Sequence, residues 1–185
     1  MAMPVCEYPG SPLARAAEQV QVPEGYRVEI VDGSILVSPT PSAQHIRIIW
    51  QLEGMLRESG PPDTAAVQML TVEIPPTGER YVPDLIVVPV ELLSGEGWVR
   101  SATDAALAVE VASPTNAEVD RVKKVRGYAV AGVPLYLLVD PLDRSVTLFG
   151  DPQEGVYRSH TQLPFGKQLE LPEPFGCAFD TTDFD

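Results

Sequence analysis

Apolar and polar residues alternate between positions 26 and 31, and this period of two predicts a β-strand with one buried face. The dipeptide Asp32-Gly33 follows, and it readily adopts the positive φ angles of a two-residue turn. A second apolar run then extends to Ser38. The pattern therefore predicts a β-hairpin over residues 26–38.

Two longer segments repeat their apolar residues at the spacing of an α-helix. The first begins after Ser42, a favourable N-cap residue, and ends at Gly60. Its apolar stripe includes His45, and a histidine in such a stripe is more often a core residue than a ligand. The second segment runs from about 116 to 131 and is closed by Gly132.

Short apolar runs rich in β-branched residues predict the strands. In chain order they are AAVQMLTVEI, RYVPDLIVVP, DAALAVEVA, PLYLLVD, SVTLFG and GVYRSHTQL. The third run, the second helix and the fourth run form a β-α-β unit, for which a parallel crossover is expected. This order of elements predicts an α/β fold in which a mixed (α+β) sheet is flanked by helices.

The first 23 residues contain four prolines and little periodic pattern. We therefore expect residues 1–23 to form a loosely packed arm, with a short helix near LARAAEQV. Residues 24–185 are expected to form a single domain, which is the usual outcome for this length. Because no long apolar span and no secretory leader pattern is visible, we expect no membrane association and a cytoplasmic location.

The charge balance of the chain limits its partners. Thirteen basic residues against 26 acidic residues give a net charge of −13. A protein that coats nucleic acid neutralises many phosphates with basic side chains, so this composition argues against such a role. Any contact with nucleic acid is expected to be local.

Several polar residues lie where the pattern requires apolar ones, or directly beside such positions. Asp84 precedes the apolar run LIVVP, and Glu110 lies inside LAVEVA. Asp120, Lys124 and Tyr128 recur every four residues along the second helix, which places them on one helical face. An isolated charge in the protein interior costs several kcal/mol unless it is paired or bound to a metal. We therefore expect these side chains to meet in space.

Two interpretations of this meeting are open. In the first, Glu110 and Lys124 form a partly buried ion pair that fixes the helix on the sheet, and Asp84 caps a turn. In the second, Asp84 and Glu110 hold a Mg²⁺ ion, which binds one or two carboxylates and keeps several waters. Lys124 would then hold the attacking water or stabilise the charge that develops during phosphodiester hydrolysis.

The motif set resembles the Uma-two family of endonucleases in the restriction-endonuclease-like PD-(D/E)XK superfamily. The resemblance rests on PD at 83–84, on EVAS at 110–113, and on the pattern D-x-x-x-K-x-x-x-Y-x-x-x-G-V-P that begins at Asp120. It covers residues 24 to 150. It implies a restriction-endonuclease-like core, Asp84 and Glu110 as ligands of Mg²⁺ or Mn²⁺, and Lys124 as the catalytic lysine.

One departure from the superfamily pattern concerns the lysine expected two residues after the second acid, because Ala112 stands there. The family resemblance assigns this role to Lys124, with Lys123 as the fallback, although Lys123 points about 100° away on the helix. The family's E-x-x-D-G pattern matches Glu29, Asp32 and Gly33, and its Ser-Pro and His region matches Ser38, Pro39 and His45. The resemblance implies that Glu29, His45, Asp120 and Tyr128 are second-layer or substrate-side members of the site.

The leading functional hypothesis is a Mg²⁺-dependent endonuclease whose expected substrate is nucleic acid, with DNA favoured over RNA. The alternative is a catalytically silent module that keeps the nuclease fold and binds protein or nucleic acid. A homodimer is expected in either case, because symmetric dimers are the commonest oligomers.

Overall fold

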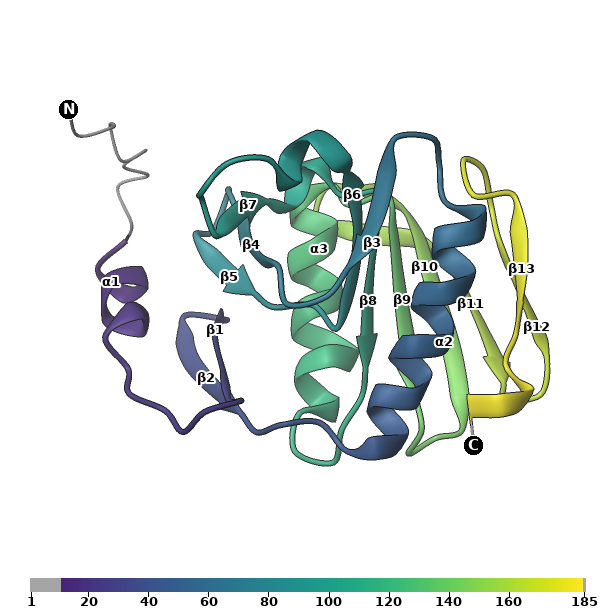
Figure 1. The fold of residues 1–185 in the computed structure, drawn as a ribbon, viewed down its shortest axis with the longest axis horizontal. Helices are drawn as coiled ribbons and strands as arrows, with labels where there is room; N and C mark the ends of the chain where they lie inside the picture. Colours follow the sequence, from purple (N-terminus) through teal and green to yellow (C-terminus); the bar gives the residue numbers. More distant parts are fainter. Residues whose placement is uncertain (1–10, 185) are drawn as a thin grey trace.

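The structure is a computed structural model that describes residues 11–184. Its strands form two mixed sheets and one small antiparallel pair (Figure 1). The strands are β1 (Arg27–Val31), β2 (Ser34–Ser38), β3 (Thr64–Val67), β4 (Thr71–Ile74), β5 (Glu79–Tyr81), β6 (Leu85–Pro89), β7 (Val99–Ser101), β8 (Leu107–Val111), β9 (Leu135–Asp140), β10 (Ser145–Gln153), β11 (Val156–Pro164), β12 (Gln168–Leu171) and β13 (Cys177–Asp180).

The larger sheet has six strands in the order β11-β10-β9-β8-β6-β3, and only its β8–β9 pair is parallel. The smaller sheet has five strands in the order β2-β1-β5-β4-β7, with a parallel pair between β4 and β7. Strands β12 and β13 pair only with each other. The predicted mixed sheet with flanking helices is therefore confirmed.

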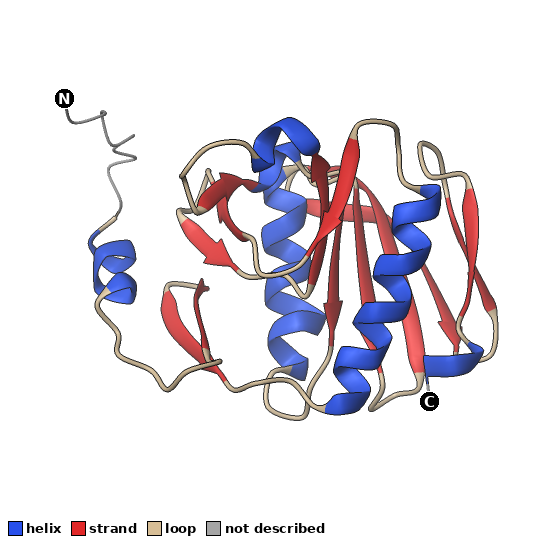
Figure 2. Ribbon diagram, viewed as in Figure 1, coloured by secondary structure: helices blue, strands red, loops and turns tan. Residues whose placement is uncertain are grey.

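The helices and the sheets are shown by type in Figure 2. The α-helices are α1 (Pro12–Glu18), α2 (Ala43–Ser59) and α3 (Val125–Ala131), and a π-helical segment (Val119–Lys124) leads directly into α3. Short 3₁₀ helices cover Val90–Leu93, Ala102–Asp104 and Thr182–Phe184.

The alternation of side chains along β8 assigns the two long helices to opposite faces of the larger sheet. Leu107, Val109 and Val111 belong to the core that α2 covers. Ala108 and Ala112 belong to the core that α3 covers, together with residues of the smaller sheet. Because side chains alternate between faces along a strand, Glu110 lies on the α3 side.

Most of the predicted elements are confirmed. The hairpin turns where it was expected, with Val31 opposite Ser34 across the turn at Asp32-Gly33. Helix α2 is capped by the Ser42 side chain, which accepts a hydrogen bond from the His45 N–H, and it ends at Gly60. The second predicted helix corresponds to the π segment and α3, which Gly132 closes in a left-handed conformation.

The prediction of one strand on each side of the PPTGE turn was wrong, because each of the two runs is split. The first run divides into β3 and β4 around Met69, whose φ of 61° interrupts the extended chain. The second divides into β5 and β6 around Pro83, which cannot donate to a strand ladder. The outer halves, β3 and β6, join the larger sheet, whereas β4 and β5 join the smaller one.

The described part of the predicted arm contains the expected short helix, α1. This helix contacts β1 and β2, Ala14 is buried, and the Glu18 carboxylate lies 2.7 Å from Nη1 of Arg80. Residues 1–10 lie outside the described residues, and the boundary near residue 24 stays a prediction. Every helix within residues 11–184 is too short or too polar to span a lipid bilayer.

Candidate active site

The two strand acids of the predicted site lie beside each other because of the register between β6 and β8. Leu85 pairs with Val109 in this antiparallel ladder, so Asp84 and Glu110, the next residues along the two strands, come together at one end of the sheet. Both are almost fully buried, with exposed fractions of 5% and 1%. The site therefore begins as two carboxylates held by backbone that the sheet fixes.

Lys124 joins these acids from the helical side. Its Nζ lies 2.9 Å from Oε1 of Glu110, 2.9 Å from Oε1 of Glu29 and 3.5 Å from Oδ1 of Asp120. The Tyr128 hydroxyl donates to the same Glu110 oxygen at 2.9 Å. These five side chains are all buried, so the predicted convergence of strand acids and helix residues is present in the structure.

The neighbouring lysine points elsewhere. Lys123 Nζ lies 3.3 Å from Oδ2 of Asp32, and the two side chains are 40% and 62% exposed. The structure thus brings Lys124 to the acids and leaves Lys123 at the surface. Asp32, which the family pattern placed near Glu29, is outside the buried cluster.

A second set of contacts surrounds Asp84. Its Oδ1 accepts a hydrogen bond from Nη1 of Arg27 at 2.6 Å, and its Oδ2 accepts one from the Val111 N–H at 2.8 Å. His45 Nε2 lies 2.9 Å from the same Oδ2, although it is not aligned for a hydrogen bond. Both Asp84 oxygens are therefore engaged by positive or partly positive groups.

Arg27 was not among the residues that the sequence pattern selected. It lies two positions before Glu29 in β1, so the two side chains share one face of the strand. Glu29 uses this face to reach Lys124 and the Val82 N–H, the latter at 2.8 Å. The period of two was visible in the sequence, and it could have placed Arg27 beside Glu29 in the site.

Ser38 and Pro39, also matched to the family pattern, lie close to the site. Ser38 is buried, and its hydroxyl accepts a hydrogen bond from Nδ2 of Asn116 at 2.7 Å. Pro39 and Asn116 line the pocket described below. The loop after β2 and the loop before the π segment are therefore joined at the site's edge.

The pKa values of the acids diverge according to their neighbours. Burial raises the pKa of Asp84, but His45 and Arg27 outweigh this effect and lower it to about 2. Burial raises the pKa of Glu110 well above its usual value despite the nearby Lys124. Burial also raises the pKa of Asp120, to about 6. The pKa of Lys124 is raised because Glu110, Glu29 and Asp120 outweigh its burial.

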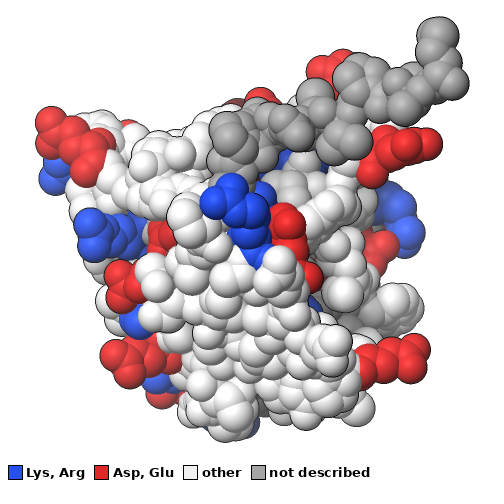
Figure 3. Space-filling model, turned by 90° about the vertical axis from the view of Figure 1, so that its left-hand side faces the viewer, with Lys and Arg blue, Asp and Glu red and all other residues white. Residues whose placement is uncertain are grey.

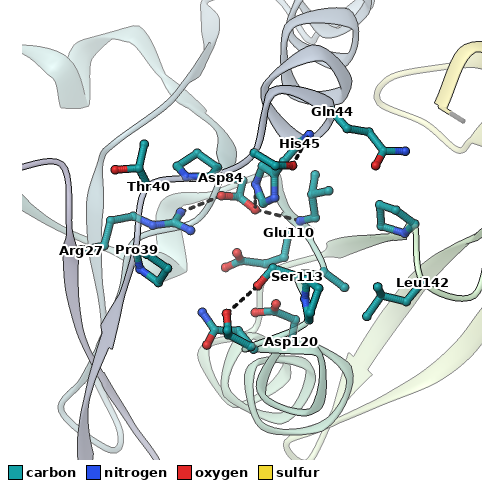
Figure 4. Close-up of a pocket in the computed structure, with 18 of the residues that line it drawn as sticks. Arg27, Pro39, Thr40, Gln44, His45, Asp84, Glu110, Ser113, Asp120 and Leu142 are labelled. Carbon is teal, nitrogen blue, oxygen red and sulfur yellow. Dashed lines mark hydrogen bonds and ion pairs between the residues drawn. The ribbon is translucent and has the colours of Figure 1, made fainter.

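A pocket of about 370 Å³ opens over these groups (Figure 4). Arg27, Asp84, Glu110, Asp120 and Lys124 contribute to its wall. In Figure 4, Arg27 lies on one side with its guanidinium directed at Asp84, His45 lies above, and Asp120 lies below Glu110. The remaining lining residues come from three loops: Pro39, Thr40, Pro41, Ser42 and Gln44 around the start of α2; Val111, Ala112, Ser113, Pro114, Thr115 and Asn116 after β8; and Pro141 and Leu142 after β9.

The charges of this cluster are compatible with a divalent cation. Four carboxylates, from Glu29, Asp84, Glu110 and Asp120, lie beside two permanent cations, Arg27 and Lys124, and one imidazole, His45, so the acids outnumber the permanent cations by two. Uncompensated charge is costly in the protein interior, and one Mg²⁺ or Mn²⁺ would balance it.

The donor set points to the same kind of ion. Within residues 11–184, no three His, Cys, Asp or Glu side chains form a ready cation cage. Mg²⁺ does not require one, because it binds through one or two carboxylates and retains waters. Among the described residues, Lys124 and Tyr128 donate hydrogen bonds to Oε1 of Glu110, and none donates to its Oε2. Asp84 and Glu110 thus fit a magnesium-type ion, although the binding itself stays a prediction.

Comparison with known proteins defines the class and then the family. The fold is that of a solved nuclease-like structure, the crystal structure of "a putative nuclease belonging to DUF820" from Anabaena variabilis ATCC 29413. The match has a TM-score of 0.72 and 17% sequence identity, and it covers 90% of this chain and 93% of that chain. At this identity the likeness concerns the fold alone.

The family follows from a second comparison. The model of the Uma2 family, described as "Putative restriction endonuclease", matches residues 15–182. The chain therefore belongs to the Uma2 family, and the resemblance found from the motifs is confirmed. The comparison with curated proteins gave no match.

Proposed function

We propose that this protein is a metal-dependent endonuclease that hydrolyses phosphodiester bonds of nucleic acid, with DNA as the expected substrate. The observation that carries the proposal is the convergence of Asp84, Glu110 and Lys124 at the floor of one pocket. Membership of the Uma2 family supports the same activity. Asp84 and Glu110 would hold Mg²⁺ or Mn²⁺, which when bound would activate water and offset negative charge on the phosphate.

Lys124 is suited to electrostatic stabilisation rather than to proton abstraction. Its raised pKa keeps the ammonium group charged at neutral pH, so it has no lone pair with which to act as a base. A fixed positive charge in a buried site stabilises the negative charge that develops on a reacting phosphate. Glu29 and Tyr128 position this part of the site, because Glu29 holds the ammonium and Tyr128 holds the Glu110 carboxylate.

Arg27 donates a hydrogen bond to the other carboxylate, and His45 lies beside it. They keep Asp84 ionised by lowering its pKa to about 2, and the Val111 N–H fixes its orientation. An ionised, oriented carboxylate is what a cation ligand requires. The contacts around Asp84 therefore support its proposed role as a metal ligand.

The direct test is cleavage of labelled DNA by the purified protein in the presence of Mg²⁺ or Mn²⁺, with EDTA as the metal-free control. Glu110→Gln and Lys124→Ala should lower cleavage by about 10²-fold or more, because the first weakens the proposed metal site and the second removes the charge that would stabilise the reacting phosphate. Lys123→Ala is the matched control, because this exposed lysine adjoins Lys124 but pairs with Asp32. Equal cleavage by all four proteins would identify the activity as a contaminant.

The non-catalytic alternative is favoured by one observation, the closed network of Lys124, Glu110, Glu29 and Tyr128. Such a network is also suited to a purely structural role, in which it fixes the helix against the sheets. Thermal melting separates the two roles, because an ion that binds the folded state alone raises the melting temperature. A site with no response to Mg²⁺ or Mn²⁺ and no cleavage would favour the silent module. The homodimer and the cytoplasmic location stay predictions.

A further inference from the structure

We propose that the site accepts an unpaired strand or an unpaired end of nucleic acid rather than an intact duplex. This inference rests on the proposed function and names its substrate class. Three features of the described residues carry it: the distribution of positive charge, the depth of the catalytic groups, and the apolar rim of the pocket.

Positive charge is scarce on this protein, and much of it is already paired. At least six of the 13 basic residues form ion pairs with acids of the same chain, namely Arg27, Arg80, Arg121, Lys123, Lys124 and Arg158. On the face drawn in Figure 3, basic side chains lie in separate small groups beside acidic ones. Proteins that hold a duplex commonly contact about 6–10 phosphates with Lys and Arg. That face offers no basic surface of that extent.

The catalytic groups lie too deep for a continuous duplex. Asp84 and Glu110 are 5% and 1% exposed, and Lys124 is 2% exposed, so a phosphate must enter the pocket to reach them. The pocket volume of about 370 Å³ is near the lower end of pockets that hold one small ligand, about 300–1,000 Å³. A phosphate within a duplex is flanked by stacked, paired nucleotides, and separating them costs free energy. An unpaired strand enters without that cost.

The rim of the pocket matches an unpaired base. Four prolines, Pro39, Pro41, Pro114 and Pro141, and the 49% exposed Leu142 line it. In Figure 4, Pro39 and Leu142 lie on opposite sides of the pocket. The flat faces of unpaired bases pack on apolar and aromatic side chains, whereas in a duplex those faces are buried against neighbouring bases. The rim can therefore contact only nucleotides that have left the stack.

The experiment compares three labelled substrates of the same sequence under the same Mg²⁺ or Mn²⁺ conditions: a single strand, a blunt duplex, and a duplex with an unpaired tail. We expect the single strand and the tail to be cut about 10-fold faster than the paired region, or more. The free energy needed to open a duplex corresponds to at least a 10-fold difference in rate. Cleavage of the tailed duplex should map to the tail.

A rim variant tests the contact independently of the chemistry. Leu142→Ser should lower kcat/KM for the single strand about threefold or more through loss of apolar contact, and should lower kcat/KM for the blunt duplex less, because paired bases do not reach the rim. Leu93→Ser is the matched control, because Leu93 is 39% exposed and lies in the 3₁₀ helix that follows the opposite end of β6 from Asp84. Equal effects of the two substitutions would overturn the role of the rim.

The outcomes separate this inference from the proposed function. If the blunt duplex is cut as fast as the single strand, the inference is wrong and the nuclease function stands. If no nucleic acid is cut with either metal, the proposed function fails and the inference fails with it. Preferential cleavage of the unpaired substrates, together with a selective effect of Leu142→Ser, supports both.

Discussion

Replacement of Lys124 by methionine is the sharpest test of the buried charge cluster. Methionine keeps an unbranched, flexible side chain but removes the ammonium group. Three carboxylate oxygens, from Glu29, Glu110 and Asp120, lie within 3.5 Å of Nζ, so the variant leaves three acids facing one another without a cation. Measurement in EDTA ensures that only the protein's own charges contribute.

The expected loss can be worked out from this geometry. Unit charges about 4 Å apart interact by about 4 kcal/mol at an effective dielectric constant of about 20, and burial of the ammonium offsets part of this gain. Removing one partner of a buried pair commonly costs about 3–5 kcal/mol. For a chain of 185 residues, 1 kcal/mol corresponds to about 2–4 °C in Tm, so Lys124→Met should melt about 6–20 °C below the wild type.

The loss should depend on pH in a defined direction. The raised folded-state pKa of Lys124 means that its stabilising contribution is complete below its unfolded pKa of 10.5, so the lysine does not itself titrate between about pH 5 and pH 8. Glu110 and Asp120 have raised pKa values and can take up protons as the pH falls. Protonated acids repel less, so the variant should lose less stability at about pH 5.5 than at about pH 8.

Urea unfolding followed by circular dichroism at both pH values measures these losses. Lys123→Met is the control, because an exposed ion pair contributes only about 0.2–1 kcal/mol. Adding Glu110→Gln to Lys124→Met should recover part of the loss, since it removes one of the unpaired charges, and the double-mutant cycle gives the coupling. Equal, small losses for the two lysine variants at both pH values would refute the assignment of a buried ammonium.

Two further predictions concern the whole protein. Without a divalent ion, stability should fall as the pH rises from about 4 to 6, because the pKa of Asp120 is raised to about 6. Stability should also fall below about pH 4, because the pKa of Asp84 is lowered to about 2. Melting curves against pH check both effects, and a stability that rises steadily from pH 4 to 7 would contradict them. Gly127→Ala should destabilise by about 1–3 kcal/mol, because the new Cβ would lie 2.0 Å from the Tyr81 hydroxyl in a buried contact. Gly54→Ala adds a Cβ that meets no atom within 4 Å apart from its chain neighbours and its own helix backbone, so it should instead stabilise by about 0.5–1 kcal/mol. Urea unfolding of both variants distinguishes packing from helix propensity.

Local patterns predicted the elements whose signals lie within a few residues. The turn at Asp32-Gly33 and the helix from Ser42 to Gly60 depend on turn and capping chemistry that the chain carries locally, and the structure has both. The same holds for the convergence of Glu110 and Lys124, because the periods of strand and helix and the cost of buried charge suffice to bring them together. Their proposed catalytic role depends on chemistry that these patterns do not measure.

The π-helical segment before α3 is a feature that local patterns did not reveal. Spacing of four residues predicts that Asp120 and Lys124 share a helical face, and they do, but across a turn that is wider than an α-helical one. No residue type in this segment marks a π-helix, because its wider turn is set by what the side chains contact. Here Lys124 of the segment contacts Glu29 and Glu110, and π segments occur frequently at functional sites.

The split at Pro83 is the reason why the contact between Arg27 and Asp84 was not predicted. A continuous strand over 80–89 would have kept Asp84 in the middle of one sheet, with no reason to approach β1. In the structure the chain leaves β5 of the smaller sheet at Tyr81 and enters β6 of the larger sheet at Leu85, so Asp84 lies where the two sheets meet. At that junction β1 can supply Arg27 to Asp84 and Glu29 to Lys124. The site is therefore built across both sheets: Arg27 of the smaller sheet pairs with Asp84, and Lys124 of the π segment pairs with one acid from each sheet.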